Sequence, residues 1–94
     1  MGGTRTVQVR IEGRVQWVGY RAWTERTALS LGLAGWVRNR ADGAVEAVFK
    51  GPADVVADML ARCKAGPRSA AVTLVAIMGE GVGVFDGFEV RRDG

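Results

Sequence analysis

The segment with the clearest potential for chemistry is a glycine-bounded stretch, Gly13-Arg14-Val15-Gln16-Trp17-Val18-Gly19-Tyr20-Arg21. It lies between a predicted strand and a predicted helix, where unpaired backbone N–H groups and the helix dipole favour an anion. The glycines allow the loop to curl so that successive N–H groups point inward, and Arg21 can close over a phosphate with two parallel hydrogen bonds. Spacing alone leaves an oxyanion cradle and an ordinary strand–helix connection equally open. The loop lacks the Gly-Lys-Ser/Thr ending of a Walker A motif.

The composition excludes whole classes of mechanism. The 94 residues include no histidine and a single cysteine, Cys63. Ser-His-Asp triads, Cys-His dyads and zinc sites built from His and Cys are therefore impossible within one chain. A lone thiol forms no internal disulfide and suits a reducing compartment, which predicts a cytoplasmic location, although an intermolecular bridge stays open. No apolar run approaches the ~20 residues of a membrane helix, and the first residues lack a secretory h-region, so we expect no membrane partner.

The charge is unevenly distributed along the chain. Residues 1–40 carry a net charge of +5 and residues 41–94 a net charge of −2, which together give +3. Most of the basic residues are arginines, whose planar fork matches carboxylate and phosphate oxygens. This distribution favours an anionic partner near the N-terminal half. From charge alone, however, a small basic protein that is simply soluble is the favoured interpretation.

Hydrophobic periodicity predicts one α+β domain over residues 1–94, with residues 1–5 as a flexible N-terminal tail. The predicted strands cover residues 7–12, 35–40, 44–50, 72–78 and 85–91, and the predicted helices cover residues 20–31 and 52–65. The strand at 72–78 is apolar enough to be central, and the strand at 85–91 is a short addition. The order β-α-β-β-α-β predicts a ferredoxin-like sandwich, an antiparallel sheet with two helices packed on one face. That fold alone does not determine function.

Each predicted helix has a face suited to the core. In the first, apolar or small residues recur at helical spacing, and Gly32 stands where a C′ glycine ends a helix, with Leu33 placed to pack back. The first face consists of Tyr20, Thr24, Ala28 and Leu31, and the stripe of the second helix consists of Val55, Val56, Met59, Leu60 and Cys63. We expect Trp36, Met59 and Cys63 to be core residues.

Two segments together resemble the signature motifs of a known family. The run Gly-Arg-Val-Gln-x-Val-Gly-Tyr-Arg at residues 13–21 and the run Gly35-Trp36-Val37-Arg38-Asn39 resemble those of the acylphosphatases, and the resemblance covers roughly residues 6–91. It implies hydrolysis of the carboxyl–phosphate bond of acyl phosphates to carboxylate and inorganic phosphate, without metal or cofactor. It also implies a monomer whose partners are these small molecules rather than nucleic acid or membrane.

The resemblance assigns roles to individual residues. Arg21 matches the phosphate-binding arginine and Asn39 the asparagine that positions the attacking water. The phosphate cradle corresponds to the backbone N–H groups of Arg14, Val15, Gln16, Trp17, Val18, Gly19 and Tyr20. We expect the side chains of Arg14 and Gln16 to be exposed. Without the motifs, Arg21 would be read as a solvated arginine and Asn39 as a turn residue.

The implied chemistry agrees with a chain that has no histidine. A carboxylate leaves without needing a proton, so general acid catalysis is dispensable. Phosphoryl transfer instead needs an in-line water and fixed positive potential around the equatorial oxygens. Because no protein base is evident, we expect a substrate phosphate oxygen to take the proton of the water.

The match fails at Trp17, where the family pattern has a glycine. If that position requires a positive φ or a close approach to phosphate, tryptophan strains the loop by about 1–3 kcal/mol. The indole then either points outward or forms a wall over the acyl group. We expect a retained cradle with the ring near the mouth of the pocket. The alternatives to an enzyme are a non-catalytic phosphate- or acyl-phosphate-binding module with a drifted loop and, less favoured, a ferredoxin-like RNA-binding module.

Overall fold

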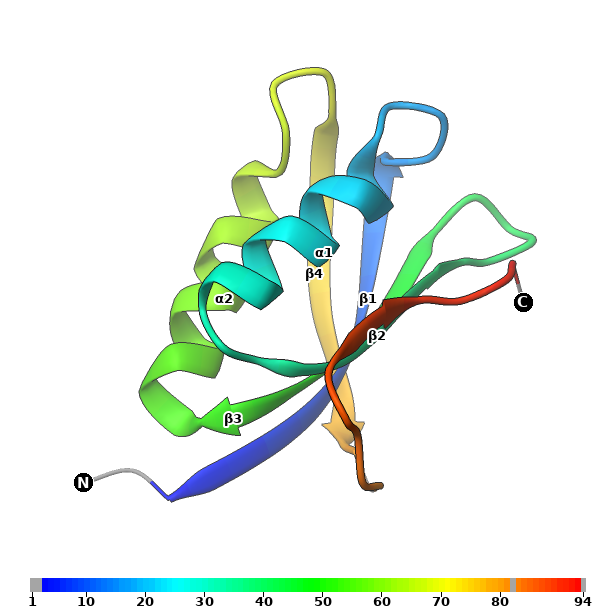
Figure 1. The fold of residues 1–94 in the computed structure, drawn as a ribbon. Coiled ribbons are helices and arrows are strands. Elements are labelled where there is room, and N and C mark those ends of the chain that lie inside the picture. The colour runs from blue at the N-terminus through cyan, green and yellow to red at the C-terminus, as the bar shows by residue number, and fades with distance from the viewer. Residues whose placement is uncertain (1–2, 82, 94) are drawn as a thin grey trace.

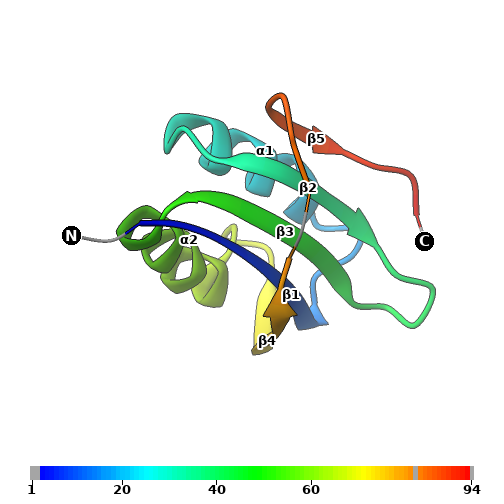
Figure 2. The same ribbon diagram turned by 90° about the horizontal axis from the view of Figure 1, so that it is seen from below.

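The computed structural model describes residues 3–81 and 83–93 and shows a two-layer α+β fold. Its elements are β1 (Thr4–Arg14), α1 (Tyr20–Ser30), β2 (Ala34–Asn39), β3 (Val45–Pro52), α2 (Ala53–Ala65), β4 (Ala71–Glu80) and β5 (Phe88–Val90). Figures 1 and 2 show both helices covering the same face of the sheet. The ferredoxin-like βαββαβ order predicted from the sequence is thus confirmed, with β5 as the additional strand. No helix in the described part of the chain is long and apolar enough to cross a membrane.

The sheet differs from the prediction in two respects. Its order is β4-β1-β3-β2-β5, and β5 pairs parallel to β2, so the sheet is mixed rather than wholly antiparallel. The prediction that residues 72–78 form a central strand was wrong, because β4 lies at the edge beside β1. Its apolar residues are buried only in part. Val72 and Val75 pack against the core, whereas Ile77 is 51% exposed and Met78 60% exposed.

The first strand starts earlier than predicted. Residues 1–5 were expected to form a flexible tail, and this is wrong for Thr4 and Arg5, which pair with Pro52 and Gly51 of β3. The reason is that β3 runs to Pro52 and offers a partner strand, and the Ala53 N–H then donates to the Gly3 carbonyl at 2.9 Å. Residues 1 and 2 of that predicted tail lie outside the described residues.

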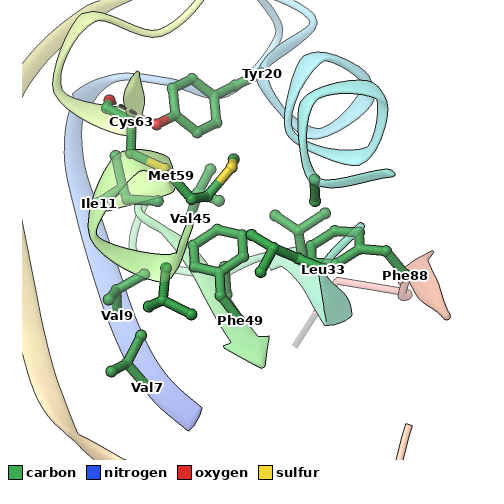
Figure 3. Packing of buried hydrophobic residues seen from close by; sticks show 14 of the residues in the cluster. Val7, Val9, Ile11, Tyr20, Leu33, Val45, Phe49, Met59, Cys63 and Phe88 are labelled. Atoms are coloured by element: carbon green, nitrogen blue, oxygen red, sulfur yellow. Dashed lines mark hydrogen bonds between the residues drawn. The ribbon is translucent and has the colours of Figure 1, made fainter. Parts of the chain in front are cut away.

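The core lies between the helices and the sheet, where β1, β3 and α2 contribute most of the fully buried side chains. Val56, Met59 and Cys63 of α2 are wholly buried, as predicted, and Val55 and Leu60 pack at the margin. Figure 3 shows these layers meeting around Phe49 and Met59.

Trp36 is buried by a different contact from the one expected. Val37 belongs to the core, so the alternation of β2 places Trp36 on the opposite sheet face. There its ring is covered by the guanidinium groups of Arg38 and Arg91, at 5.1 and 4.9 Å from the ring centroid. The prediction of a core tryptophan was therefore right about burial and wrong about the side of the sheet.

Helix α1 is fixed at both ends by hydrogen bonds. At its C-terminal end the Leu33 N–H donates to the Ala28 carbonyl at 2.9 Å and the Gly32 N–H to the Leu29 carbonyl at 3.0 Å, which confirms the predicted glycine-ended helix. At its N-terminal end the buried Tyr20 hydroxyl donates to the Cys63 carbonyl at 2.8 Å and ties α1 to α2 (Figure 3). Burial, reinforced by the neighbouring Cys63, raises the pKa of Tyr20 above its ordinary value, so the hydroxyl stays a donor.

Because the thiol of Cys63 is buried, the stability of the fold is expected to fall at alkaline pH. Burial raises its pKa to about 12, against about 8.5 in an unfolded chain. The stabilisation is complete below the unfolded pKa and is lost as pH rises from there towards the folded pKa. We expect the free energy of unfolding to fall by about 2 kcal/mol between pH 8 and pH 10 because of this group.

Urea denaturation at the two pH values measures this change, with Cys63→Ala as the matched variant. The substitution lowers stability at pH 8 but removes the thiol titration, so its stability should change much less over the same interval. An equal pH dependence in the parent and the variant would contradict the assignment.

Candidate active site

The loop between β1 and α1 has the backbone geometry of an anion-binding nest. Trp17 has a φ of 65° and Gly19 a φ of 79°, while the residue between them has a negative φ. Alternation of this kind points successive N–H groups into one concavity. The backbone N–H groups of residues 15–20 donate to no other group in the described part of the chain. The loop therefore presents free donors where the sequence predicted an oxyanion cradle.

The N-terminus of α1 adds uncompensated positive potential to this loop. Gly19 caps the helix without a side-chain hydrogen bond, and the first turn contains no acidic residue but does contain Arg21. Helix α2 has the opposite arrangement, with Asp54 in its first turn and Arg62 and Lys64 in its last. Because a helix N-terminus attracts negative charge, the start of α1 is suited to bind an anion.

Arg21 carries the positive charge in the first turn of α1. Its side chain is 35% exposed and its Nη1 donates to Asp93 Oδ1 at 2.9 Å, which joins the start of α1 to the C-terminal segment. Asp93 is itself 59% exposed, and an ion pair this open to water contributes about 0–1 kcal/mol. A phosphate presented by the loop can therefore replace the Asp93 carboxylate at the guanidinium fork.

Asn39 has the opposite character, since it is only 3% exposed at the end of β2. Its Oδ1 is fully buried and accepts no hydrogen bond from any residue in the described ranges. A buried acceptor without a donor costs about 1–3 kcal/mol, so an orphan of this kind calls for an explanation. Asn39 also lines the cavity beside the loop, so its amide is available to a molecule bound there.

Arg21 and Asn39 line one cavity of about 280 Å³ beside the loop. The other residues that line it are Val15, Trp17, Gly19, Tyr20, Ala22, Glu25 and Val90. The structure thus brings together six of the residues predicted for the site: Val15, Trp17, Gly19, Tyr20, Arg21 and Asn39. Sequence reasoning missed Ala22, Glu25 and Val90, although Glu25 stands one helical turn beyond Arg21 and its spacing gave a usable signal.

The remaining predicted residues, Arg14, Gln16 and Val18, do not line the cavity. Gln16 was expected to have an exposed side chain, and this was wrong, because its Nε2 donates to the Arg40 carbonyl at 2.7 Å and the Ala44 carbonyl at 2.9 Å. Val18 packs against the core, and its carbonyl accepts from Ser69 Oγ at 2.8 Å. The Arg14 side chain is exposed, as expected.

Trp17 keeps the left-handed backbone at the position where the family pattern has a glycine. Trp17 is one of the residues that line the cavity and is 91% exposed, so its ring lies outside the cavity interior. The loop therefore has a left-handed backbone at this position at the expense of strain in a non-glycine residue.

The cavity contains no ready site for a metal ion. Across residues 3–81 and 83–93 there is no group of three or more His, Cys, Asp or Glu side chains arranged to hold one. The groups that face the cavity are instead backbone N–H donors, one guanidinium, one amide and one carboxylate. This set is suited to an anion and a water molecule.

Comparisons with known proteins agree with this geometry. The family model described as acylphosphatase matches residues 7–90. An acylphosphatase of Nitrobacter hamburgensis is 65% identical over 68 residues, covering 72% of this chain and 69% of that protein. One from Rhodopseudomonas palustris is 54% identical over 87 residues, covering 93% of this chain and 85% of that protein. The solved acylphosphatase structure from Coxiella burnetii superposes with a TM-score of 0.88 at 34% identity, covering 94% of this chain and 93% of that one.

The double hydrogen bond of Gln16 generates a prediction about the stability of the site. Gln16→Glu preserves the shape but removes both donors and places a charge beside two carbonyl oxygens. We expect the free energy of unfolding in urea to fall by about 1–3 kcal/mol. Arg14→Gln, two residues away with an exposed side chain, is the control and should change stability by less than about 0.5 kcal/mol. Equal stabilities for Gln16→Glu and the parent would show that the contact does not hold the loop.

Proposed function

The chain belongs to the acylphosphatase family, and on that premise we propose that the cavity between the β1–α1 loop and the end of β2 is its catalytic site. The observation that carries the proposal is that Arg21, Asn39 and residues of the loop with free amides line one cavity. An enzyme that hydrolyses acyl phosphates needs groups that bind the phosphoryl group and a group that positions the attacking water. The cavity offers one group of each kind.

The loop and Arg21 hold the phosphoryl group. Its equatorial oxygens accept hydrogen bonds from the N–H groups of residues 15–20, and the dipole of α1 stabilises the charge. The guanidinium exchanges Asp93 for a phosphate oxygen and neutralises the charge that develops during transfer. Because these donors are fixed before the substrate arrives, little reorganisation is needed in the transition state.

Asn39 positions the attacking water. Its Oδ1 accepts a hydrogen bond from the water, while the Nδ2 group donates to a phosphate oxygen. The two ends of one amide then fix the water relative to phosphorus, which is the requirement for in-line displacement. The new bond forms between the water oxygen and phosphorus as the bond from phosphorus to the carboxylate oxygen breaks.

The proton of the water passes to a phosphate oxygen of the substrate. The leaving carboxylate needs no proton, so neither a histidine nor any other general acid is required. Glu25 is the one carboxylate that lines the cavity and is thus the only alternative acceptor there. We assign the proton to the substrate because its phosphate oxygen already contacts the nucleophile.

The wider assignments follow from the same site. We take a small acyl phosphate as substrate, with a carboxylate and inorganic phosphate as products, and a monomer as the working form. The free, buried thiol of Cys63 suits the reducing cytoplasm. No observation on the described residues favours a non-catalytic phosphate-binding module over the enzyme.

Hydrolysis of a synthetic acyl phosphate in the absence of metal ions tests the assignment. We expect Arg21→Ala to lower kcat/KM by about 10³-fold, because the phosphoryl group loses its guanidinium partner. Asn39→Ala should lower kcat by about 10²-fold or more with a smaller effect on KM, because the water loses its position. Glu25→Gln should leave kcat within a few-fold, because the substrate takes the proton.

Arg26→Ala is the matched control, since Arg26 is an exposed arginine of the same helix that does not line the cavity. It should retain parental kinetics. Full activity in Arg21→Ala or Asn39→Ala would overturn the assignment of the site. A loss of about 10²-fold in Glu25→Gln would instead make Glu25 the base.

A further inference from the structure

Trp17 combines two features that are unfavourable in the unliganded protein. It is the one non-glycine residue with a positive φ in the described ranges, and its side chain is 91% exposed. A left-handed backbone is strained for a residue with a Cβ, and a large exposed aromatic ring gains nothing from burial. Neither feature is needed for the cradle, because glycine adopts the same conformation without strain and without a ring. The side chain itself therefore requires an explanation.

The position of the ring relative to the reacting bond supplies that explanation. In an in-line displacement the leaving group departs from the side of phosphorus opposite the attacking water. With the water held by buried Asn39, the acyl group points away from the interior and towards the open side of the cavity. That side is where Trp17 stands, on the same loop that holds the phosphoryl group.

Apolar residues line the cavity together with Trp17. Ala22 and Val90, which is 40% exposed, also line it, whereas the charged lining residues are Arg21 and Glu25 on α1. An acyl group leaving the cradle thus meets an indole face and an exposed valine. An acetyl group is too small to cover these surfaces, while an aromatic or extended apolar acyl group can pack against them.

We propose that Trp17 is a specificity-determining residue whose indole packs against the acyl group of the substrate. The enzyme then prefers acyl phosphates with aromatic or extended apolar acyl groups over acetyl phosphate. This inference rests on the proposed function of the cavity and adds a substrate class to it. The strained backbone and the exposed ring become favourable only when the acyl group covers the indole.

The test compares kcat/KM for benzoyl phosphate and acetyl phosphate in four proteins: the parent, Trp17→Phe, Trp17→Ala and Trp17→Gly. We expect the benzoyl-to-acetyl ratio to fall about tenfold in both the Ala and Gly variants and to stay within about threefold of the parent in Trp17→Phe. The Ala variant keeps the strained backbone and the Gly variant relieves it, so agreement between them assigns the effect to the ring. Val84→Ala removes a side chain that is 90% exposed outside the cavity and should leave the ratio unchanged.

A binding measurement separates packing from chemistry. Competitive inhibition by benzoylphosphonate and acetylphosphonate, which are not hydrolysed, should show the same loss of preference in the Ala and Gly variants. An unchanged ratio in both, or restoration of the parental ratio by Gly alone, would overturn the proposal, the latter because it would assign the effect to backbone strain. If the parent hydrolyses neither substrate, the proposed function itself fails. If it hydrolyses both and the ratio does not depend on Trp17, only this inference fails.

Discussion

The constraint on which the rest of the structure depends is the unneutralised N-terminus of α1. This helix starts with free backbone N–H groups, without a capping side chain, and with an arginine in its first turn. Such a terminus destabilises an isolated helix, so tertiary contacts have to hold it. Tyr20, Thr24 and Ala28 are buried along one face, and the Tyr20 hydroxyl bonds to α2. Packing holds the helix and leaves its charged end available to a ligand.

The same division between support and function recurs across the cavity. Gln16 belongs to the loop but turns its side chain away from the cavity to bond the carbonyls of Arg40 and Ala44. Since Arg40 directly follows Asn39, this contact holds the loop in place relative to the end of β2. The loop amides and the Asn39 amide are thereby positioned without using any of the groups that face the ligand. Fixed donors of this kind are what electrostatic catalysis requires.

Sequence reasoning recovered most of the fold because the helices and inner strands carry regular patterns. The stripe of Val56, Met59 and Cys63 and the glycine-ended helix at Gly32 are local features, and both are present. The errors concern partners that lie far apart in the chain. An apolar strand has the same sequence pattern at the centre of a sheet as at its edge. The position of β4 was therefore predicted wrongly. For the same reason the guanidinium cover of Trp36 and the contacts of Gln16 were missed, since their partners come from other elements.

The two motifs were enough to predict the residues proposed for the site. They do not indicate which contacts Arg21 and Asn39 make in the unliganded protein. The ion pair between Arg21 and Asp93 is weak, because both side chains are exposed to water. Asn39 is buried, and among the described residues its Oδ1 has no partner to give up. In the proposed mechanism a phosphate replaces the weak contact of Arg21, and the attacking water contacts the amide of Asn39. Both changes favour the bound state, and neither needs a side chain that titrates near neutral pH. The proposed mechanism therefore requires no histidine, because a helix N-terminus, one arginine and one amide supply all the protein groups that it uses.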